Sequence, residues 1–416
     1  METLKFLMVS THYPPYHLGG DAVMVEYLAR ELASRGHEAH ILYSPSVYEV
    51  LRRSRPNRLD TSGNEAVHRH EFLNRHPKYR LYTTLVTGSC ERAESTLKNL
   101  CRRIGPDVVH WHNTKGFIGI PHSVVGTVSL YTAHDYYTIC PRSNLTRPNM
   151  AFCDNPKLCQ LCLVRWRKPV QLWRLGGRRI IRPDADLKIL CPSEYTARRL
   201  RDKGIAVHGI LRNFVPDPGK RACKEPRKRG RIVYVGMLEP HKGPQTLLAS
   251  FIDSANEHDF RLAIVGDGSL RESLAATART SQVADRIDVP GFVSREALRS
   301  ILCDAAALVI PSEWPENAPL VALEALALGV PIIGSDQGGI PEIISPESGS
   351  RIYPAGDRGA LSGMLTSVWE DRAVLDSLGE KARRTYESRF SPDIHIREYL
   401  RIVKGFERDA TEVSKP

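Results

Sequence analysis

The sequence predicts an α/β protein with two doubly wound domains, each built around a parallel sheet. Short apolar runs typical of buried strands alternate with segments of helical periodicity along most of the 416 residues. The alternation falls into two blocks, and a chain of this length divides between two hydrophobic cores more readily than it packs around one. We expect domains at residues 1–215 and 216–390, followed by a terminal helical segment at 391–416.

Each block opens with a strand, a glycine-containing turn and a helix. In the first block, residues 4–9 form the expected strand, a glycine pair ending at Gly20 lies in the turn, and helical spacing starts at residue 22. In the second block, residues 231–235 form the strand, and Lys242 precedes the glycine that marks the helix start. Backbone N–H groups at such helix starts favour phosphate, although a glycine pair by itself also fits a tight turn.

Two acidic residues, Glu316 and Glu324, flank the start of an apolar helix in the second block. Asn317 is the expected helix cap, and Pro319 suits the first turn, where a missing N–H costs nothing. Glu324 lies on the otherwise apolar helix, so its carboxylate needs a partner to offset the loss of water. That partner is either a structural cation or the hydroxyl groups of a ligand.

Three histidines lie on or just after expected strands of the first block. His134 follows the strand that begins at residue 130, and ligands of open α/β sheets bind at the carboxyl ends of strands. The alternative for His134 is a core histidine. His110 and His112 project from one face of another strand, where we expect side chains satisfied by hydrogen bonds rather than a metal site.

Four of the nine cysteines fall within 23 residues, as Cys140, Cys153, Cys159 and Cys162. Thiolates at this spacing favour structural zinc or an iron–sulfur cluster, and we expect a small metal-bearing insertion at about residues 138–165. The alternative is a set of cysteines that simply pack as small apolar side chains. The N-terminal apolar run is too short for a signal peptide, which predicts a cytoplasmic protein and argues against disulfides.

A net charge of +11 admits nucleic acid, an anionic membrane surface or phosphorylated substrates as partners. Residues 165–182 mix arginines with Trp166 and Trp173, a composition that suits a peripheral membrane contact. The alternative is a basic segment that shields its own domain. A second basic cluster at 220–231 contains proline and glycine and is typical of a solvated linker. A nucleic-acid interface needs basic residues along one face, whereas here they gather in two places.

The second block carries a long motif that resembles the retaining glycosyltransferases of family 4, which have the GT-B fold. The matching residues are Glu316, Glu324, Ala325, Gly329, Pro331, Ser335, Asp336, Gly338, Gly339, Pro341 and Glu342. Further matches are Gly236, Leu238, Lys242 and Gly243, but Met237 stands where the family usually has an arginine that binds the donor diphosphate. His241 is a candidate replacement for that arginine.

The resemblance implies two Rossmann-like domains facing a central cleft, an acceptor-side domain first and a donor-binding domain second, with the last helix crossing back to the first domain. By this analogy Glu316 and His134 act at the donor sugar, Glu324 holds the ribose, and Lys242 and Gly20 contact the diphosphate. The remaining donor-binding residues implied by the resemblance are Asn317, Ala318, Pro319 and Leu320.

The resemblance also implies the reaction. A sugar would move from a nucleotide-sugar to a sugar or lipid-linked acceptor hydroxyl with retained anomeric configuration, without a catalytic metal and without nucleic acid as a partner. Cell-envelope or exopolysaccharide synthesis is the expected setting. The alternatives are an epimerase of the same fold acting on UDP-N-acetylglucosamine, and a basic protein that binds nucleic acid or a membrane surface.

Overall fold

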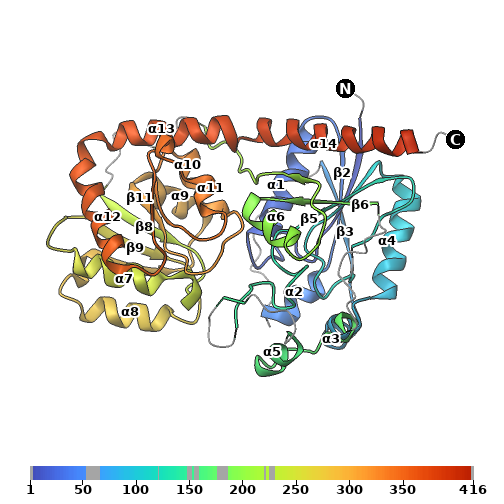
Figure 1. Ribbon diagram of the computed structural model, residues 1–416, viewed down its shortest axis with the longest axis horizontal. Coiled ribbons are helices and arrows are strands. Elements are labelled where there is room, and N and C mark those ends of the chain that lie inside the picture. Colours follow the sequence, from blue (N-terminus) through green and yellow to red (C-terminus); the bar gives the residue numbers. More distant parts are fainter. Residues whose placement is uncertain are drawn as a thin grey trace. The chain divides into compact units, whose positions relative to one another are not determined.

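The computed structural model describes residues 3–52, 66–119, 121–147, 152–153, 159–175, 186–219, 222–223 and 230–413. The chain forms two compact units, of which the first comprises Met1–Asn213 with His395–Pro416 and the second Phe214–Ile394. Each unit contains one parallel sheet with helices packed against it, as the alternation of strands and helices predicts (Figure 1). Among the described helices none combines the length and the apolar character needed to cross a bilayer.

The sheet of the first unit has the order β3-β2-β1-β4-β5-β6-β7, and every neighbouring pair is parallel. Its strands are β1 Lys5–Val9, β2 Glu38–Tyr43, β3 Val67–Glu71, β4 Val108–Trp111, β5 Val128–Thr132, β6 Leu187–Cys191 and β7 Gly209–Ile210. The order reverses between β1 and β4. In doubly wound sheets, the carboxyl ends of strands at such a reversal point are where ligands bind.

Several helices of the first unit pack buried apolar side chains against its sheet. The helices are α1 Gly20–Ser34, α2 Pro45–Arg52, α3 Pro77–Thr87, α4 Glu91–Ile104, α5 Cys159–Arg165 and α6 Glu194–Arg201, with a 3-10 turn η2 at Leu172–Arg174. In α4, Ala93, Leu97, Leu100 and Ile104 are buried at helical spacing. Helix α1 begins at Gly20, two residues before the predicted start.

The last helix, α14 (Pro392–Val413), begins in the second unit and continues in the first. Its Tyr399 hydroxyl lies 2.9 Å from His110 Nδ1, and its ring packs 5.8 Å from Phe6 of β1. His395 of the same helix lies with its Nδ1 2.7 Å from the Arg212 carbonyl oxygen. Figure 1 shows this red helix beside the blue N-terminal elements of the first unit. These contacts make the C-terminal helix part of the first unit's core.

The sheet of the second unit has the order β10-β9-β8-β11-β12-β13 and is likewise parallel throughout. Its strands are β8 Arg231–Val235, β9 Arg261–Val265, β10 Ile287–Gly291, β11 Ala305–Ile310, β12 Ile332–Ser335 and β13 Arg351–Tyr353. The order reverses between β8 and β11. The loops that follow these two strands are therefore the ones placed to bind a ligand.

The helices of the second unit are α7 Pro244–Asp253, α8 Arg271–Thr280, α9 Arg295–Cys303, α10 Leu320–Ala327, α11 Ile340–Ile343, α12 Arg358–Glu370 and α13 Leu375–Arg389. Its 3-10 turns are η3 Pro240–Lys242, η4 Ala284–Arg286, η5 Pro346–Ser348 and η6 Asp371–Val374.

The sequence predicts a helix over 296–306 and a strand over 307–310, and both boundaries are wrong. Alanines at 305–307 suit either state, and burial between β8 and β12 draws them into the strand.

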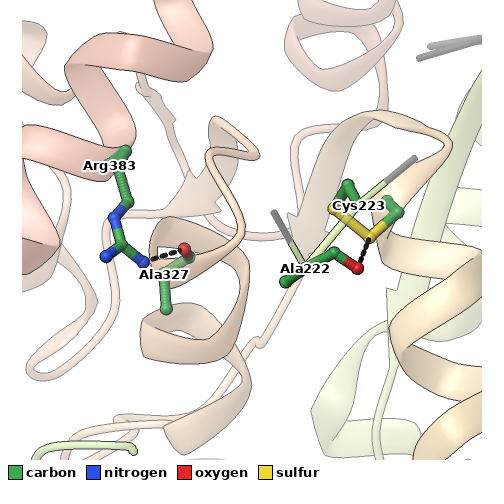
Figure 2. The surroundings of a disulfide bond; sticks show 5 residues. Ala222, Cys223, Ala327 and Arg383 are labelled. Atoms are coloured by element: carbon green, nitrogen blue, oxygen red, sulfur yellow. Dashed lines mark hydrogen bonds between the residues drawn. A yellow bond between two sulfur atoms is a disulfide. The ribbon is translucent and has the colours of Figure 1, made fainter. Parts of the chain in front are cut away.

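A disulfide joins Cys223 to Cys303, the last residue of α9, within the second unit (Figure 2). The expectation that the protein has no disulfide is wrong for this pair. The two cysteines are 80 residues apart in sequence, so their proximity comes from the fold. Figure 2 also shows Arg383 of α13 donating to the Ala327 carbonyl. The same guanidinium pairs with Asp217 at 2.7 Å.

Candidate active site

The structure brings Lys242 and Glu316 together, although 74 residues separate them in sequence. Lys242 Nζ lies 2.5 Å from Glu316 Oε1, and the hydroxyl of Ser312 donates to the same carboxylate oxygen at 2.9 Å. Both ionic side chains are largely shielded, with 16% and 12% of their surface exposed. Shielding of this kind strengthens the electrostatic attraction and fixes the position of both charges.

Two glycines allow the loops that carry these side chains to pack closely against neighbouring backbone at the reversal point of the second sheet. Lys242 ends turn η3 in the loop after β8, and the next residue, Gly243, has φ +70°, where a Cβ would lie 2.0 Å from the Pro311 carbonyl oxygen. Glu316 lies in the loop after β11, and Gly338 has φ +63° with its ideal Cβ position 2.2 Å from the Glu316 carbonyl oxygen. Only glycine fits both places.

The sequence did not predict that aromatic side chains lie next to the Lys242–Glu316 ion pair. Lys242 Nζ lies 4.9 Å from the centre of the Trp314 ring, within the range of a cation–π attraction. His241, the candidate replacement for the missing arginine, contacts the same ring edge to face at 5.6 Å. The only sequence signal for Ser312 and Trp314 was their position in the loop that carries Glu316.

Helix α10 carries Glu324, and its start differs from the prediction. The N-cap is Pro319 rather than Asn317, because the backbone turns into the helix two residues later than expected. Asn317 is buried in the preceding loop, and Leu320 is the first helical residue. The sequence placed the cap on Asn317 because amide side chains favour that position, but the fold uses a β-region proline instead.

The Glu324 carboxyl is half-buried, and burial raises its pKa above the ordinary value, an effect that Arg295 partly opposes. Among the residues that the structure describes, no side chain donates a hydrogen bond to this carboxylate. A half-buried carboxylate that receives no side-chain hydrogen bond is stabilised by any hydroxyl that can donate to it.

Helix starts expected to receive phosphate have no side-chain cap within the described residues. This holds for α7 with N-cap Gly243, for α10 with N-cap Pro319, and for α1, which starts at Gly20 after N-cap Gly19. Ser294 caps α9 and Asp357 caps α12 through their side chains, whereas α4 and α8 also lack a side-chain cap. An uncapped start leaves N–H groups and the positive end of the helix dipole available to an anion.

In the first unit, His134 lies two residues beyond β5, at the carboxyl end predicted for it. Its Nε2 is 2.9 Å from His112 Nδ1, and burial lowers its pKa to about 4, against a smaller raising effect of Asp21. The imidazole is therefore neutral at pH 7. His110 uses both ring nitrogens, towards Tyr399 and Thr132, which matches the expectation of a satisfied strand histidine.

The four clustered cysteines lie close enough to influence one another electrostatically. Burial first, and then neighbouring Cys140, Cys153 and Cys162, raise the pKa of Cys159 to about 11. Among the described residues, the ligand atoms that all lie within 4.8 Å of one another belong to Glu38, His40 and His68, and not to the cysteines. A zinc or iron site made by the cysteines stays a prediction.

Two sequence models of known families match the chain, one in each unit. The model described as Glycosyltransferase Family 4 matches residues 18–211, and that described as Glycosyl transferases group 1 matches residues 220–385. The second match contains the Lys242–Glu316 pair and α10. The chain belongs to the group 1 glycosyltransferases. It is thus an enzyme that transfers a sugar, and the resemblance read from its motifs is confirmed.

Individual relatives agree with this family. A glycogen synthase of Mycobacterium tuberculosis is 27% identical over 406 residues, covering 93% of this chain and 91% of the relative. A glycosyltransferase of amylovoran biosynthesis from Erwinia amylovora is 27% identical over 180 residues, or 42% of this chain and 44% of the relative. The solved sucrose-phosphate synthase from Thermosynechococcus elongatus aligns over 99% of both chains with a TM-score of 0.67 at 18% identity, which shows the GT-B fold.

We predict that His134 and His395 make folding of the first unit sensitive to mild acid. Burial lowers the pKa of His134 and of His395 from 6.5 to about 4, so between these values the unfolded chain binds protons that the folded unit does not. The free energy of unfolding should therefore decrease as the pH falls from 6.5 towards 4. Urea unfolding at pH 7, 6 and 5 measures this slope. His134→Gln should flatten it while His76→Gln, at an exposed position, should not; equal slopes would contradict the prediction.

Proposed function

We propose that this glycosyltransferase moves a sugar from a nucleotide-sugar to an acceptor hydroxyl with retention of anomeric configuration. The observation that carries the proposal is the shielded Lys242–Glu316 pair at the reversal point of the second sheet. It places a fixed cation and a fixed carboxylate side by side, next to two uncapped helix starts. A donor offers the complementary groups, a diphosphate for the cation and sugar hydroxyls for the carboxylate.

The diphosphate would bind to the N–H groups that start α7 and α10 and to Lys242. An ammonium group has three N–H donors, and Glu316 takes one of them, so two remain for phosphate oxygens. These fixed dipoles and charges favour the negative charge that builds up on the departing diphosphate. The arrangement supports transfer without a catalytic metal, and compensates for Met237 in the position of the usual arginine.

Glu324 would accept hydrogen bonds from the ribose hydroxyls. Its carboxyl is half-buried, its pKa is raised by burial, and no described residue donates to it. Two ribose hydroxyls supply two donors to its two oxygens, which replaces the hydrogen bonds that the carboxylate loses on leaving water. The backbone of Asn317, Ala318, Pro319 and Leu320, between Glu316 and Glu324, is our proposal for the wall of the donor-sugar site.

In the transfer step, the bond between the anomeric carbon and the diphosphate oxygen breaks, and that oxygen keeps the electron pair. The acceptor oxygen forms the new bond on the same face, and its proton passes to the departing phosphate. Glu316 would hold the sugar hydroxyls near the reacting carbon and keep Lys242 in place. The roles that the resemblance implies for His134 and Gly20 of the first unit stay predictions.

We predict that Glu316→Ala lowers the transfer rate by at least about a hundredfold, because it removes the sugar contact and releases Lys242 from its fixed position. The measurement is release of nucleoside diphosphate from the cognate donor, with circular dichroism to verify folding. Glu313→Gln, three residues earlier and exposed, is the matched control and should retain activity. A fully active Glu316→Ala enzyme would refute the role of Glu316.

Transfer should also persist with EDTA.

We predict that one nucleoside diphosphate raises the melting temperature of the purified protein, because a ligand that binds only the folded state stabilises it by about 2.7 kcal/mol at a hundredfold its Kd. UDP, GDP and ADP, with their common sugar conjugates, form the test panel. The shift should be lost in Lys242→Met and kept in Lys381→Met, which changes an exposed lysine on α13. If none of these nucleotides shifts the melting, the diphosphate site proposed here does not exist.

We further propose a cell-envelope or exopolysaccharide acceptor, reached by peripheral contact of the first unit with the cytoplasmic face of an anionic membrane. Exposed apolar side chains gather on α3, α5 and η2, namely Tyr79, Tyr82, Leu161, Val164, Leu172 and Leu175. Hydrogen bonds link these elements, from Trp173 to the Leu85 carbonyl and from Gln160 to Gln171. Arg165, Arg167 and Lys168 are exposed on the same segment and suit an anionic surface.

Part of the basic segment has a structural role, as the alternative interpretation expects. Trp173 is buried, and Arg174 donates to the Tyr137 carbonyl at 2.5 Å and to Gln171 at 2.6 Å. Residues 176–182 lie outside the described part of the chain. The membrane proposal therefore rests on α3, α5 and the exposed residues around η2.

We predict that the protein sediments with vesicles containing phosphatidylglycerol and less with vesicles of phosphatidylcholine alone, because the exposed basic side chains attract anionic headgroups. Leu161→Glu with Val164→Glu should reduce binding several-fold by placing charge on the apolar surface. Val374→Glu, at an exposed apolar position of the second unit, is the control. Equal binding of both variants would refute contact through α5.

A further inference from the structure

The start of strands β2 and β3 carries a cluster of metal-binding side chains that the glycosyltransferase reaction does not use. Glu38 and His40 alternate on β2, while His68 and His70 alternate on β3, so each pair projects from one face of its strand. The two strands pair in parallel with His40 beside His68. The register therefore places all four side chains on the same face of the sheet.

The distances within this cluster suit a metal ion. Glu38 Oε1 lies 2.7 Å from His40 Nε2, and the His40 and His68 rings stack with centroids 4.6 Å apart. One ligand atom from each of Glu38, His40 and His68 lies within 4.8 Å of the others. Ligand atoms around a tetrahedral zinc ion are about 3.3 Å apart, as follows from bonds of about 2.0–2.1 Å. Small side-chain rotations would bring the three atoms to that separation.

We propose that Glu38, His40 and His68 form a binding site for a divalent transition metal, with zinc as the best match. Two imidazoles and one carboxylate are ligands that zinc accepts, and three protein ligands leave a fourth position for water. His68 is exposed and Glu38 is partly exposed, which gives an ion access, while His40 is buried beneath them. The site is independent of the proposed transfer chemistry.

His70 has the place of a supporting partner. Its Nε2 lies 3.0 Å from Nδ1 of His40, the ring nitrogen opposite the one that faces Glu38. A histidine that binds metal through one nitrogen commonly donates its other N–H to a neighbouring acceptor, which fixes the orientation of the ring. His70 can accept this hydrogen bond in the tautomer that carries its proton on Nδ1, which gives up the contact from Arg103. Metal binding would therefore reverse the direction of the His40–His70 hydrogen bond.

Two cations near the cluster limit its affinity. Lys5 Nζ lies 3.8 Å from Glu38 Oε2, and Arg103 Nη2 lies 3.5 Å from His70 Nδ1. Without a metal, the same contacts form a chain of hydrogen bonds from Arg103 through His70 and His40 to Glu38. This metal-free chain is the competing explanation for the cluster, and the experiment must separate the two.

The position of the site indicates what a bound ion would do. β3 is the edge strand of the first sheet, and the ligands lie at the starts of the strands, whereas His134 follows the carboxyl end of β5. The ion would link the edge strand to β2 and stabilise that pairing. We therefore expect zinc to change the stability of the first unit rather than the rate of sugar transfer.

The test uses the full chain without a polyhistidine tag, stripped with EDTA and then titrated with zinc chloride. We expect saturable binding and a rise of several degrees in melting temperature. His68→Ala and Glu38→Gln should lower the affinity at least tenfold and remove the shift. His76→Ala, which removes another exposed histidine of the same unit, should leave both unchanged. Because His68 is exposed, its removal should not prevent folding.

Cobalt(II) distinguishes this site from the cysteine cluster. A site of two histidines and a glutamate should give cobalt d–d absorption without sulfur-to-cobalt charge transfer, and His68→Ala should remove that absorption. The proposal is wrong if zinc and cobalt bind only with a charge-transfer band, or if His68→Ala binds them as wild type does. Failure here leaves the transfer proposal untouched, since the nucleotide and activity measurements involve none of these residues.

Discussion

The ion pair between Lys242 and Glu316 joins two loops that leave neighbouring strands of the second sheet, and the proposed donor site depends on it. Each charge is mostly shielded from water, so removing one partner leaves the other poorly solvated. Ser312 supports the carboxylate, and the backbone of Gly338 packs against Glu316. The starts of α7 and α10 directly follow these two loops, and Glu324 lies on α10.

The topology explains why the pair lies where it does. In a parallel sheet whose order reverses between β8 and β11, the loops after these strands run in opposite directions and leave their ends accessible. The first sheet reverses in the same way between β1 and β4, and Gly20, Asp21 and His134 follow strands near that point. The metal cluster at Glu38, His40 and His68 lies at the starts of the strands instead, which separates it from this chemistry.

Three further features affect the stability or solubility of the two units. Burial lowers the pKa of His110, His112 and His134, so these side chains carry no protonation cost at pH 7 and weaken the folded state in acid. Exposed apolar side chains on α3 and α5 cost solubility unless a surface covers them. The disulfide between Cys223 and Cys303 ties the segment before β8 to the end of α9.

The sequence by itself determined the fold class, most strand positions and the family, because apolar periodicity and the Glu316–Glu342 motif are local patterns. Residues 231–235 were predicted as a strand with the observed boundaries. Only the tertiary structure decided that Lys242 pairs with Glu316, that Pro319 rather than Asn317 caps α10, and that Cys223 meets Cys303. These outcomes depend on loop paths and strand register, which bring together residues whose spacing in sequence carries no signal.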